Sequence, residues 1–210
     1  MEGLCMLKLI IDGLRREGHH VYSVMDDLKN VPYGGDDVLV PEKDMDPISF
    51  LMENVDELGV DYVYPIAPDR ELGIIASKLK GEVDMICSEP DAIKTAADKW
   101  QTYKTLEEKG LRQPETFEGS CPKKNFVVKP RYGVGCEGVC ISSVAGSESI
   151  NQEYIRGVDA SVSVFSDGRN SKAICLNKQH IIRTGNLLGY SGGFAPLSHP
   201  LRDDAFVLAE

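Results

Sequence analysis

Three glycines between two β-rich runs are the most chemically suggestive feature of the sequence. Gly133, Gly135 and Gly138 separate the run FVVK from the run VCIS. This pattern predicts a β-hairpin with a glycine-rich tip. Lys129 ends the first run, so a cation lies at the base of the hairpin. Backbone N–H groups of such a tip, together with an ammonium group, can surround the phosphates of a nucleoside triphosphate.

The spacing of these glycines also matches G-x-G-x-x-G, the fingerprint of dinucleotide-binding proteins. In that fingerprint a helix begins inside the glycine pattern, and its N-terminal N–H groups bind the pyrophosphate. Here the short β-branched run VCISS follows instead. The context therefore disfavours a dehydrogenase. That interpretation stays open as an alternative, as does an ordinary glycine-rich connection between strands.

A second candidate segment lies downstream of the hairpin. A strand end that turns from polar to apolar is formed by Gln152, Glu153, Tyr154 and Ile155. Exposed backbone at such a strand end can pair with the edge of an adenine ring. Asp159 follows in the next β-rich run, and its carboxylate can accept hydrogen bonds from ribose hydroxyls.

Upstream of the hairpin, Asp98 and Lys99 open a predicted helix at residues 98–109. Asp98 is a suitable N-cap, which puts Lys99 at the first helical position. A cation there is slightly unfavourable against the helix dipole. Lys99 is therefore a functional candidate, with a solvated first-turn lysine as the simpler interpretation.

Three segments, DKWQTYKTLEEKGLRQPET, FVVKPRYGVGCEGV and QEYIRGVDASVSV, resemble the ATP-grasp ligases in their order and spacing. The resemblance implies an α/β and α+β protein with the ATP-grasp fold. In that fold an N-terminal Rossmann-like (pre-ATP-grasp) domain precedes two α+β lobes that hold ATP between them. The implied domains are residues 1–89, the central lobe with the hairpin at 90–156, and a C-terminal lobe at 157–210. We expect the last lobe to be incomplete and a strand to precede the first helix in the full protein.

The resemblance also assigns the parts of a nucleotide site. The residues carried over are Lys99 and Lys129 for the phosphates, Gly133 and Gly135 for closure of the hairpin, Gln152, Glu153, Tyr154 and Ile155 for adenine, and Asp159 for the ribose. ATP and Mg²⁺ are the implied cofactors. The family's magnesium ligands, an acid followed by a Glu-x-Asn motif, have no match here. We therefore assign no metal ligand and no proton-transfer residue.

In ATP-grasp ligases a carboxylate attacks the γ-phosphoryl group of ATP, and an amine then displaces phosphate from the acylphosphate. The resemblance thus implies an ATP-dependent carboxylate–amine ligase with small-molecule partners. The patterns EGLCML, LNKQHI and YSGGFAPLSHP are similar to an archaeal branch containing tyramine–glutamate ligase, which acts on the route to methanofuran. A non-catalytic ATP-binding module is the main alternative. A protein-kinase-like phosphotransferase would need H-R-D and D-F-G signatures, which the sequence lacks.

The composition indicates a globular, cytoplasmic protein. With 210 residues and 42% hydrophobic residues, the chain can bury a substantial core. A net charge of −10 and a pI of about 4.9 argue against nucleic-acid and anionic-membrane partners. The 6 cysteines form no C-x-x-C pair, which indicates free thiols in a reducing compartment. No signal peptide or apolar run of membrane length is present in the sequence.

Helices and strands alternate in the first part of the chain, which predicts a small parallel α/β layer. There we expect helices at 2–18, 46–58 and 71–79, strands at 20–25, 37–41, 61–67 (buried) and 85–87, and a turn at 33–35. Later we expect helices at 90–97, 98–109 and 201–210, a turn at 167–170 between two long antiparallel strands, and a loop at 190–196.

Overall fold

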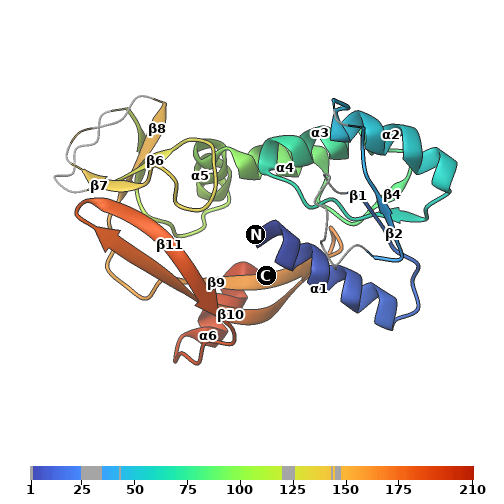
Figure 1. Cartoon of the computed structure of the whole chain (residues 1–210). Helices are drawn as coiled ribbons and strands as arrows, with labels where there is room; N and C mark the ends of the chain where they lie inside the picture. The colour runs from blue at the N-terminus through green and yellow to red at the C-terminus, as the bar shows by residue number, and fades with distance from the viewer. Residues whose placement is uncertain (1, 25–34, 43, 120–125, 143, 145–147) are drawn as a thin grey trace. The chain divides into compact units, whose positions relative to one another are not determined.

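The computed structural model describes all residues except 1, 25–34, 43, 120–125, 143 and 145–147 (Figure 1). The chain forms two compact units, residues 1–94 and residues 95–210, which we describe separately. The three domains predicted from the sequence, with boundaries after residues 89 and 156, stay a prediction. The turn predicted at residues 33–35 lies mostly outside the described residues. None of the described helices is long and apolar enough to cross a membrane.

The first unit alternates helices with short parallel strands, as the sequence predicts. Strand β1 (Tyr22–Val24) pairs with β2 (Asp37–Leu39), and β3 (Tyr62–Val63) pairs with β4 (Asp84–Met85), both in parallel. The helices are α1 (Glu2–Arg16), α2 (Pro47–Leu58), α3 (Asp69–Leu79) and α4 (Pro90–Ala97), the last of which continues into the second unit.

Helices α2 and α3 bury the core of the first unit. Val55 of α2 and Ile75 and Leu79 of α3 are 6%, 8% and 1% exposed. The partly buried apolar residues that pack against them are Ile48, Leu51, Met52, Val60, Val63, Ala67, Val83 and Met85. Asp46 caps α2 by accepting a hydrogen bond from the Ser49 N–H at 2.9 Å. Two amphipathic helices, of which α2 has a side-chain cap, therefore stabilise this unit.

The buried strand predicted at residues 61–67 is wrong in both length and burial. Only Tyr62 and Val63 form β3, and Tyr62 is 63% exposed. Pro65 and Pro68 follow closely, and proline has no N–H with which to continue a strand ladder. The chain consequently leaves the sheet after two residues.

The second unit is built on one antiparallel sheet with the strand order β5-β8-β6-β7-β11-β10-β9 (Figure 1). Its strands are β5 (Thr116–Glu118), β6 (Phe126–Pro130), β7 (Cys140–Ser142), β8 (Ser149–Glu153), β9 (Ala160–Ser166), β10 (Ser171–Thr184) and β11 (Leu187–Phe194). Helix α5 (Lys99–Glu108) precedes the sheet, and α6 (Arg202–Ala209) packs against β9 and β10.

Two predicted hairpins are confirmed in this sheet. β6 and β7 pair antiparallel around the glycine-rich tip. β9 and β10 pair antiparallel on either side of residues 167–170. In that turn Oδ1 of Asp167 accepts hydrogen bonds from the N–H groups of Arg169, at 2.8 Å, and Asn170, at 2.6 Å. An aspartate side chain thus closes the turn, as its sequence indicates.

The loop predicted at residues 190–196 is wrong, because most of this segment belongs to β11. This strand pairs with β10 on one side and with β7 on the other. At Gly193 an added Cβ would lie 2.2 Å from the carbonyl oxygen of Lys178 on β10. The glycine run therefore permits a close approach between strands, which is a second use of glycine besides loops.

The contact between β7 and β11 is the shortest pairing in the described sheet. Leu187 is aligned with Cys140. Beside this pair, the Ile141 N–H donates to the carbonyl oxygen of Asn186 at 2.7 Å, and the Leu188 N–H donates to the carbonyl oxygen of Val139 at 2.9 Å. Strands β5, β8, β6 and β7 are thus joined to β11, β10 and β9 through a few backbone hydrogen bonds.

The substitution Gly193→Ala should strongly destabilise the second unit, because the new methyl group would overlap the Lys178 carbonyl oxygen. We expect a loss of roughly 2–4 kcal/mol in the free energy of unfolding, measured by chemical denaturation. Gly189→Ala is the control, since its Cβ would meet Cγ1 of Ile182 at an ordinary 3.4 Å. Equal stability of the two variants would contradict the close approach.

Candidate functional site

The tip of the β6–β7 hairpin has the backbone shape that its glycines predict. Gly133, Gly135 and Gly138 have φ values of 106°, 68° and 68°, which favour glycine over residues with a side chain. At Gly138 an added Cβ would also lie 2.9 Å from Cγ of Pro130. Gly133 and Gly135 are exposed. Their backbone is therefore accessible to a ligand.

Two lysine ammonium groups lie at this hairpin. Nζ of Lys99, the first residue of α5, donates to the carbonyl oxygen of Gly133 at 2.7 Å. Nζ of Lys129, on β6, donates to Oε1 of Gln152 at 2.6 Å. Burial lowers the pKa of Lys129, and the neighbouring charge of Lys99 lowers it further. The two cations are thus close enough to repel each other, and an anion bound between them would relieve that repulsion.

The sheet register explains why Lys129 meets Gln152. Lys129 is aligned with Ile150 on β8. Because cross-strand partners, and residues two apart on one strand, share a face, Lys129 and Gln152 are diagonal neighbours. Nε2 of Gln152 in turn donates to Oγ1 of Thr116 at 3.0 Å. The Gln152 side chain therefore orients a phosphate-binding candidate, and the contact predicted between this strand end and adenine stays a prediction.

The remaining predicted site residues lie at or after the end of β8. Glu153 is the last residue of β8, and Tyr154 and Ile155 beyond it are 40% and 60% exposed. The carbonyl oxygen of Asp159 accepts hydrogen bonds from the Gln179 N–H, at 3.0 Å, and from Nζ of Lys178, at 3.2 Å. Asp159 is thus held by β10, whereas the two lysines are held by α5 and β6.

Asp98 carries a network that the sequence predicts only in part. Its Oδ1 accepts hydrogen bonds from the N–H groups of Trp100, at 3.0 Å, and Gln101, at 3.2 Å, which confirms the predicted cap of α5. Arg131 donates to both carboxylate oxygens, from Nε at 2.8 Å and from Nη2 at 2.7 Å. The Tyr132 hydroxyl donates to Oδ2 at 3.1 Å. The Asp98 carboxylate therefore accepts hydrogen bonds both from α5 and from residues at the start of the hairpin tip.

The ion pair shifts the protonation equilibria of both partners. The hydrogen bond from Arg131 lowers the pKa of Asp98 from 3.8 to about 2, with the backbone bonds at the cap adding to the effect. Asp98 in turn raises the pKa of Arg131. Arg131 also donates from Nη1 to Oε1 of Glu118 at 2.8 Å. The only sequence signal was an arginine directly after Lys-Pro, and its partner lies 33 positions earlier in the chain.

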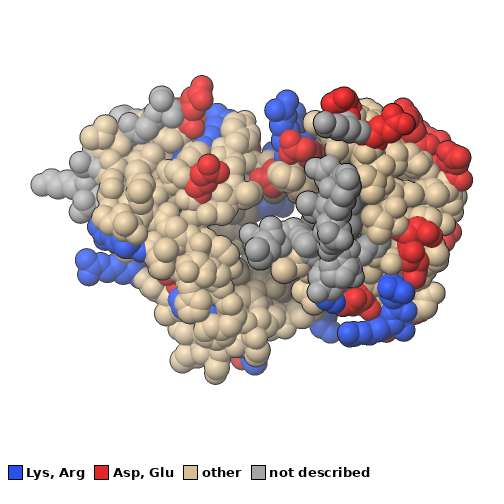
Figure 2. All heavy atoms as spheres, in the orientation of Figure 1, with Lys and Arg blue, Asp and Glu red and all other residues tan. Residues whose placement is uncertain are grey.

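Charge is distributed unevenly along the chain. Asp and Glu clearly outnumber Lys and Arg in residues 1–94, whereas the two kinds are about equally numerous in residues 95–210. On the face shown in Figure 2, acidic side chains gather over α2. The acidic net charge therefore belongs to the first unit, and the lysines of the second unit lie in a part of the chain with balanced charge.

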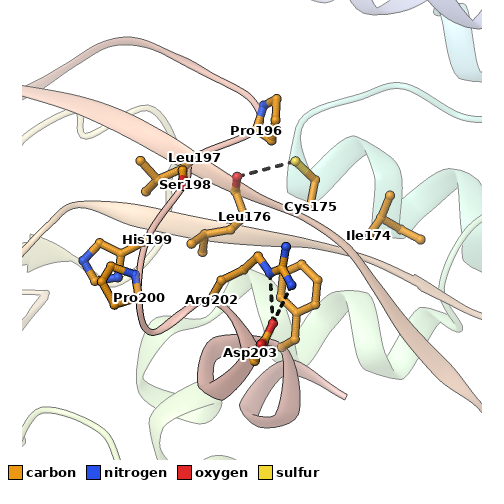
Figure 3. A pocket seen from close by; sticks show the side chains of 11 residues that line it. Ile174, Cys175, Leu176, Pro196, Leu197, Ser198, His199, Pro200, Arg202 and Asp203 are labelled. Atoms are coloured by element: carbon orange, nitrogen blue, oxygen red, sulfur yellow. Dashed lines mark hydrogen bonds and ion pairs between the residues drawn. The ribbon is translucent and has the colours of Figure 1, made fainter.

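A pocket of about 420 Å³ lies elsewhere in the second unit, between β10, the segment before α6, and α6 itself (Figure 3). Its lining comprises Ile174, Cys175, Leu176, Pro196, Leu197, Ser198, His199, Pro200, Arg202, Asp203 and Phe206. Arg202 and Asp203 form an ion pair at 2.8 Å and so neutralise each other. The pocket therefore presents little net charge to a triphosphate, whereas the hairpin presents two ammonium groups.

Candidate metal ligands are not clustered in the part of the chain that the structure describes. No group of three or more His, Cys, Asp or Glu side chains that could hold a metal ion occurs among the described residues. The oxygens of Asp98, the acid nearest to Lys99 in sequence, are already occupied by hydrogen-bond donors. A carboxylate saturated in this way is a poor metal ligand.

Residues 96–210 match the ATP-grasp domain family. The match covers more than half of the chain and includes the sheet, the glycine-rich hairpin and both lysines. The chain therefore belongs to the ATP-grasp family, which confirms the fold class predicted from its sequence.

The chain is similar to tyramine–L-glutamate ligase of Methanocaldococcus fervens, with 31% identity over 150 residues, covering 70% of this chain and 47% of the ligase. Among solved structures, an ATP-grasp superfamily protein from Archaeoglobus fulgidus is 28% identical with a TM-score of 0.57, covering 70% of this chain and 47% of that protein. The biotin carboxylase domain of Hydrogenobacter thermophilus 2-oxoglutarate carboxylase, in complex with MgADP, ADP and bicarbonate, shares the fold. Its TM-score is 0.75 at 15% identity, covering 99% of this chain and 55% of that one. The chain spans about half the length of the curated relatives it matches.

Acid should weaken the contact between α5 and the hairpin. Because the pKa of Asp98 is lowered from 3.8 to about 2, its ionised form stabilises the folded state above pH 3.8. That contribution is lost as the pH falls toward 2. The total is about 2 kcal/mol, with roughly half of it lost by pH 3.

Urea denaturation followed by fluorescence measures this loss, since Trp100 is the single tryptophan and lies in the first turn of α5. Asp98→Asn is the control, because it keeps the cap and removes the titrating group. The wild-type protein should lose more stability than this variant between pH 5 and pH 3. Identical losses would show that Asp98 does not carry the effect.

Proposed function

We propose that this chain binds ATP at the β6–β7 hairpin and provides the nucleotide site of an ATP-dependent carboxylate–amine ligase. The observation that carries the proposal is the pair of ammonium groups at the glycine-rich tip, where Lys99 contacts Gly133 and Lys129 contacts Gln152. Two repelling cations with accessible backbone beside them favour a polyanion. Membership in the ATP-grasp family supports ATP as that polyanion.

In the proposed reaction a carboxylate oxygen attacks the γ-phosphorus of ATP, and the bond to the β-phosphate oxygen breaks. An acylphosphate and ADP result. The amine nitrogen then attacks the acyl carbon, phosphate leaves, and the nitrogen loses a proton as the amide forms. Lys99 and Lys129 would neutralise the charge that develops on the transferred phosphoryl group. The exposed backbone at Gly133 and Gly135 lets the tip approach the phosphates.

The remaining contacts follow the same proposal. The backbone at Gln152, Glu153, Tyr154 and Ile155 would line adenine, and Asp159 would bind the ribose hydroxyls. Mg²⁺ would accompany ATP, because the carboxylase of Hydrogenobacter thermophilus was crystallised with MgADP. When bound, this ion would neutralise phosphate charge. We assign it no ligand among the described residues. We also propose a cytoplasmic location, in keeping with the free thiols predicted from the sequence.

For the substrates we propose glutamate and tyramine, which would place the reaction on the route to methanofuran in an archaeal cell. The identity of 31% with the Methanocaldococcus fervens ligase supports this choice. The alternative is a non-catalytic ATP-binding module. It is favoured by one observation, the lack of a cluster of three or more candidate metal ligands among the described residues.

Calorimetric titration with MgATP tests binding, and release of ADP in the presence of glutamate and tyramine tests the reaction. Binding together with ADP release that requires both substrates is the expected result. Binding without ADP release for any carboxylate and amine would favour the module. Absence of ATP binding would overturn the proposal.

Lys129→Met should weaken ATP binding by about 10- to 100-fold, because a charge-assisted hydrogen bond is lost. The melting temperature should stay the same or rise, since burial already opposes the charge of Lys129. Lys172→Met, at an exposed position on β10, is the matched control and should bind ATP normally. Equal ATP affinities in the two variants would remove Lys129 from the site.

A further inference from the structure

We propose that Asp98 and Arg131 are positioning residues that lock the glycine-rich hairpin and the Lys99 ammonium group into one phosphate-binding unit. This inference rests on the proposed ATP site. Neither residue was assigned a nucleotide contact from the sequence. We infer their role from the hydrogen bonds that join the start of α5 to the hairpin.

One carboxylate, that of Asp98, connects two separate elements of the second unit. Asp98 caps α5 through the N–H groups of Trp100 and Gln101, and it accepts two hydrogen bonds from Arg131 and one from Tyr132 at the start of the hairpin tip. Asp98 is only 5% exposed. A partly buried, bidentate Arg–carboxylate pair has a defined orientation as well as a favourable energy. The helix and the hairpin are consequently fixed relative to each other.

Lys99 is attached to the hairpin through both its backbone and its ammonium group. Its backbone N–H donates to the carbonyl oxygen of Arg131 at 3.1 Å, and its Nζ donates to the carbonyl oxygen of Gly133 at 2.7 Å. The Arg131 N–H itself donates to the carbonyl oxygen of Glu148 at 3.2 Å. Because the backbone of Lys99 is held through Arg131, its ammonium group can turn from Gly133 to a phosphate without a shift of the chain.

Asp98 and Arg131 are both occupied by protein partners and are therefore poor candidates for direct contact with the nucleotide. The oxygens of Asp98 are saturated and its pKa of about 2 makes it a poor proton acceptor near neutral pH. Arg131 is paired with both Asp98 and Glu118, so its charge is compensated. Both residues therefore act through the hairpin and Lys99.

The substitution Asp98→Asn separates positioning from helix capping. Asparagine caps helices as well as aspartate does, but its neutral amide cannot accept both Arg131 hydrogen bonds. We expect the affinity for ATP to fall about 10-fold, while the affinity for adenosine, which has no phosphates, stays unchanged. Calorimetric or competition titrations give both values. Circular dichroism and Trp100 fluorescence should report an intact fold.

The matched control is Asp46→Asn, the same change at the N-cap of α2, where the carboxylate bonds Ser49. This variant should bind ATP like the wild-type protein. The double variant Asp98→Asn with Arg131→Met should bind ATP no worse than Asp98→Asn alone. Each change removes the same Asp98–Arg131 interaction, so the second change has nothing further to remove. The single variant Arg131→Lys should bind ATP more weakly than the wild-type protein, since lysine cannot make the bidentate contact with Asp98.

The outcomes separate this inference from the proposed function. Absence of ATP binding by the wild-type protein would overturn both. Wild-type ATP affinity in Asp98→Asn would overturn the positioning role alone. An equal loss of ATP and adenosine affinity would also overturn it, because that result means general damage to the fold. A further large loss on adding Arg131→Met would show that Arg131 binds the phosphates directly.

Discussion

The hydrogen bonds of two lysine side chains at the glycine-rich hairpin, Lys99 and Lys129, are the interactions on which the candidate site depends. Lys129 is half-buried on β6 and Lys99 begins α5, so secondary structure fixes the backbone of each lysine. The Lys99 ammonium group donates a hydrogen bond to the carbonyl oxygen of Gly133, and the Lys129 ammonium group donates one to the side-chain oxygen of Gln152. The arrangement is therefore suited to an anionic ligand that can replace them.

Local patterns predicted local structure well in this chain. The glycine-rich hairpin, the Asp98 cap and the turn closed by Asp167 each depend on a few neighbouring residues, and all three are present. The pair of lysines at the hairpin was expected from the family resemblance. That resemblance rests on the order of three sequence segments along the chain and not on any one of them alone.

The failures concern features that tertiary context decides. The run at residues 190–196 reads as a loop, yet it forms part of β11 because strands on both sides supply partners for its backbone. The strand predicted at residues 61–67 stops early at its prolines. The sequence does not predict the ion pair between Arg131 and Asp98, because the two residues are 33 positions apart. Long-range pairs of this kind have no local pattern, and a single sequence does not reveal them.

The short pairing between β7 and β11 has a mechanical consequence for the hairpin. Strands β5, β8, β6 and β7 form one hydrogen-bonded block, and β11, β10 and β9 form another. Only the Cys140–Leu187 pair and the bonds beside it connect the blocks within the described ladder. Bending the sheet along this line disturbs fewer hydrogen bonds than bending it elsewhere. The block that carries Lys129 is therefore held to its neighbour by fewer backbone contacts than hold its own strands together.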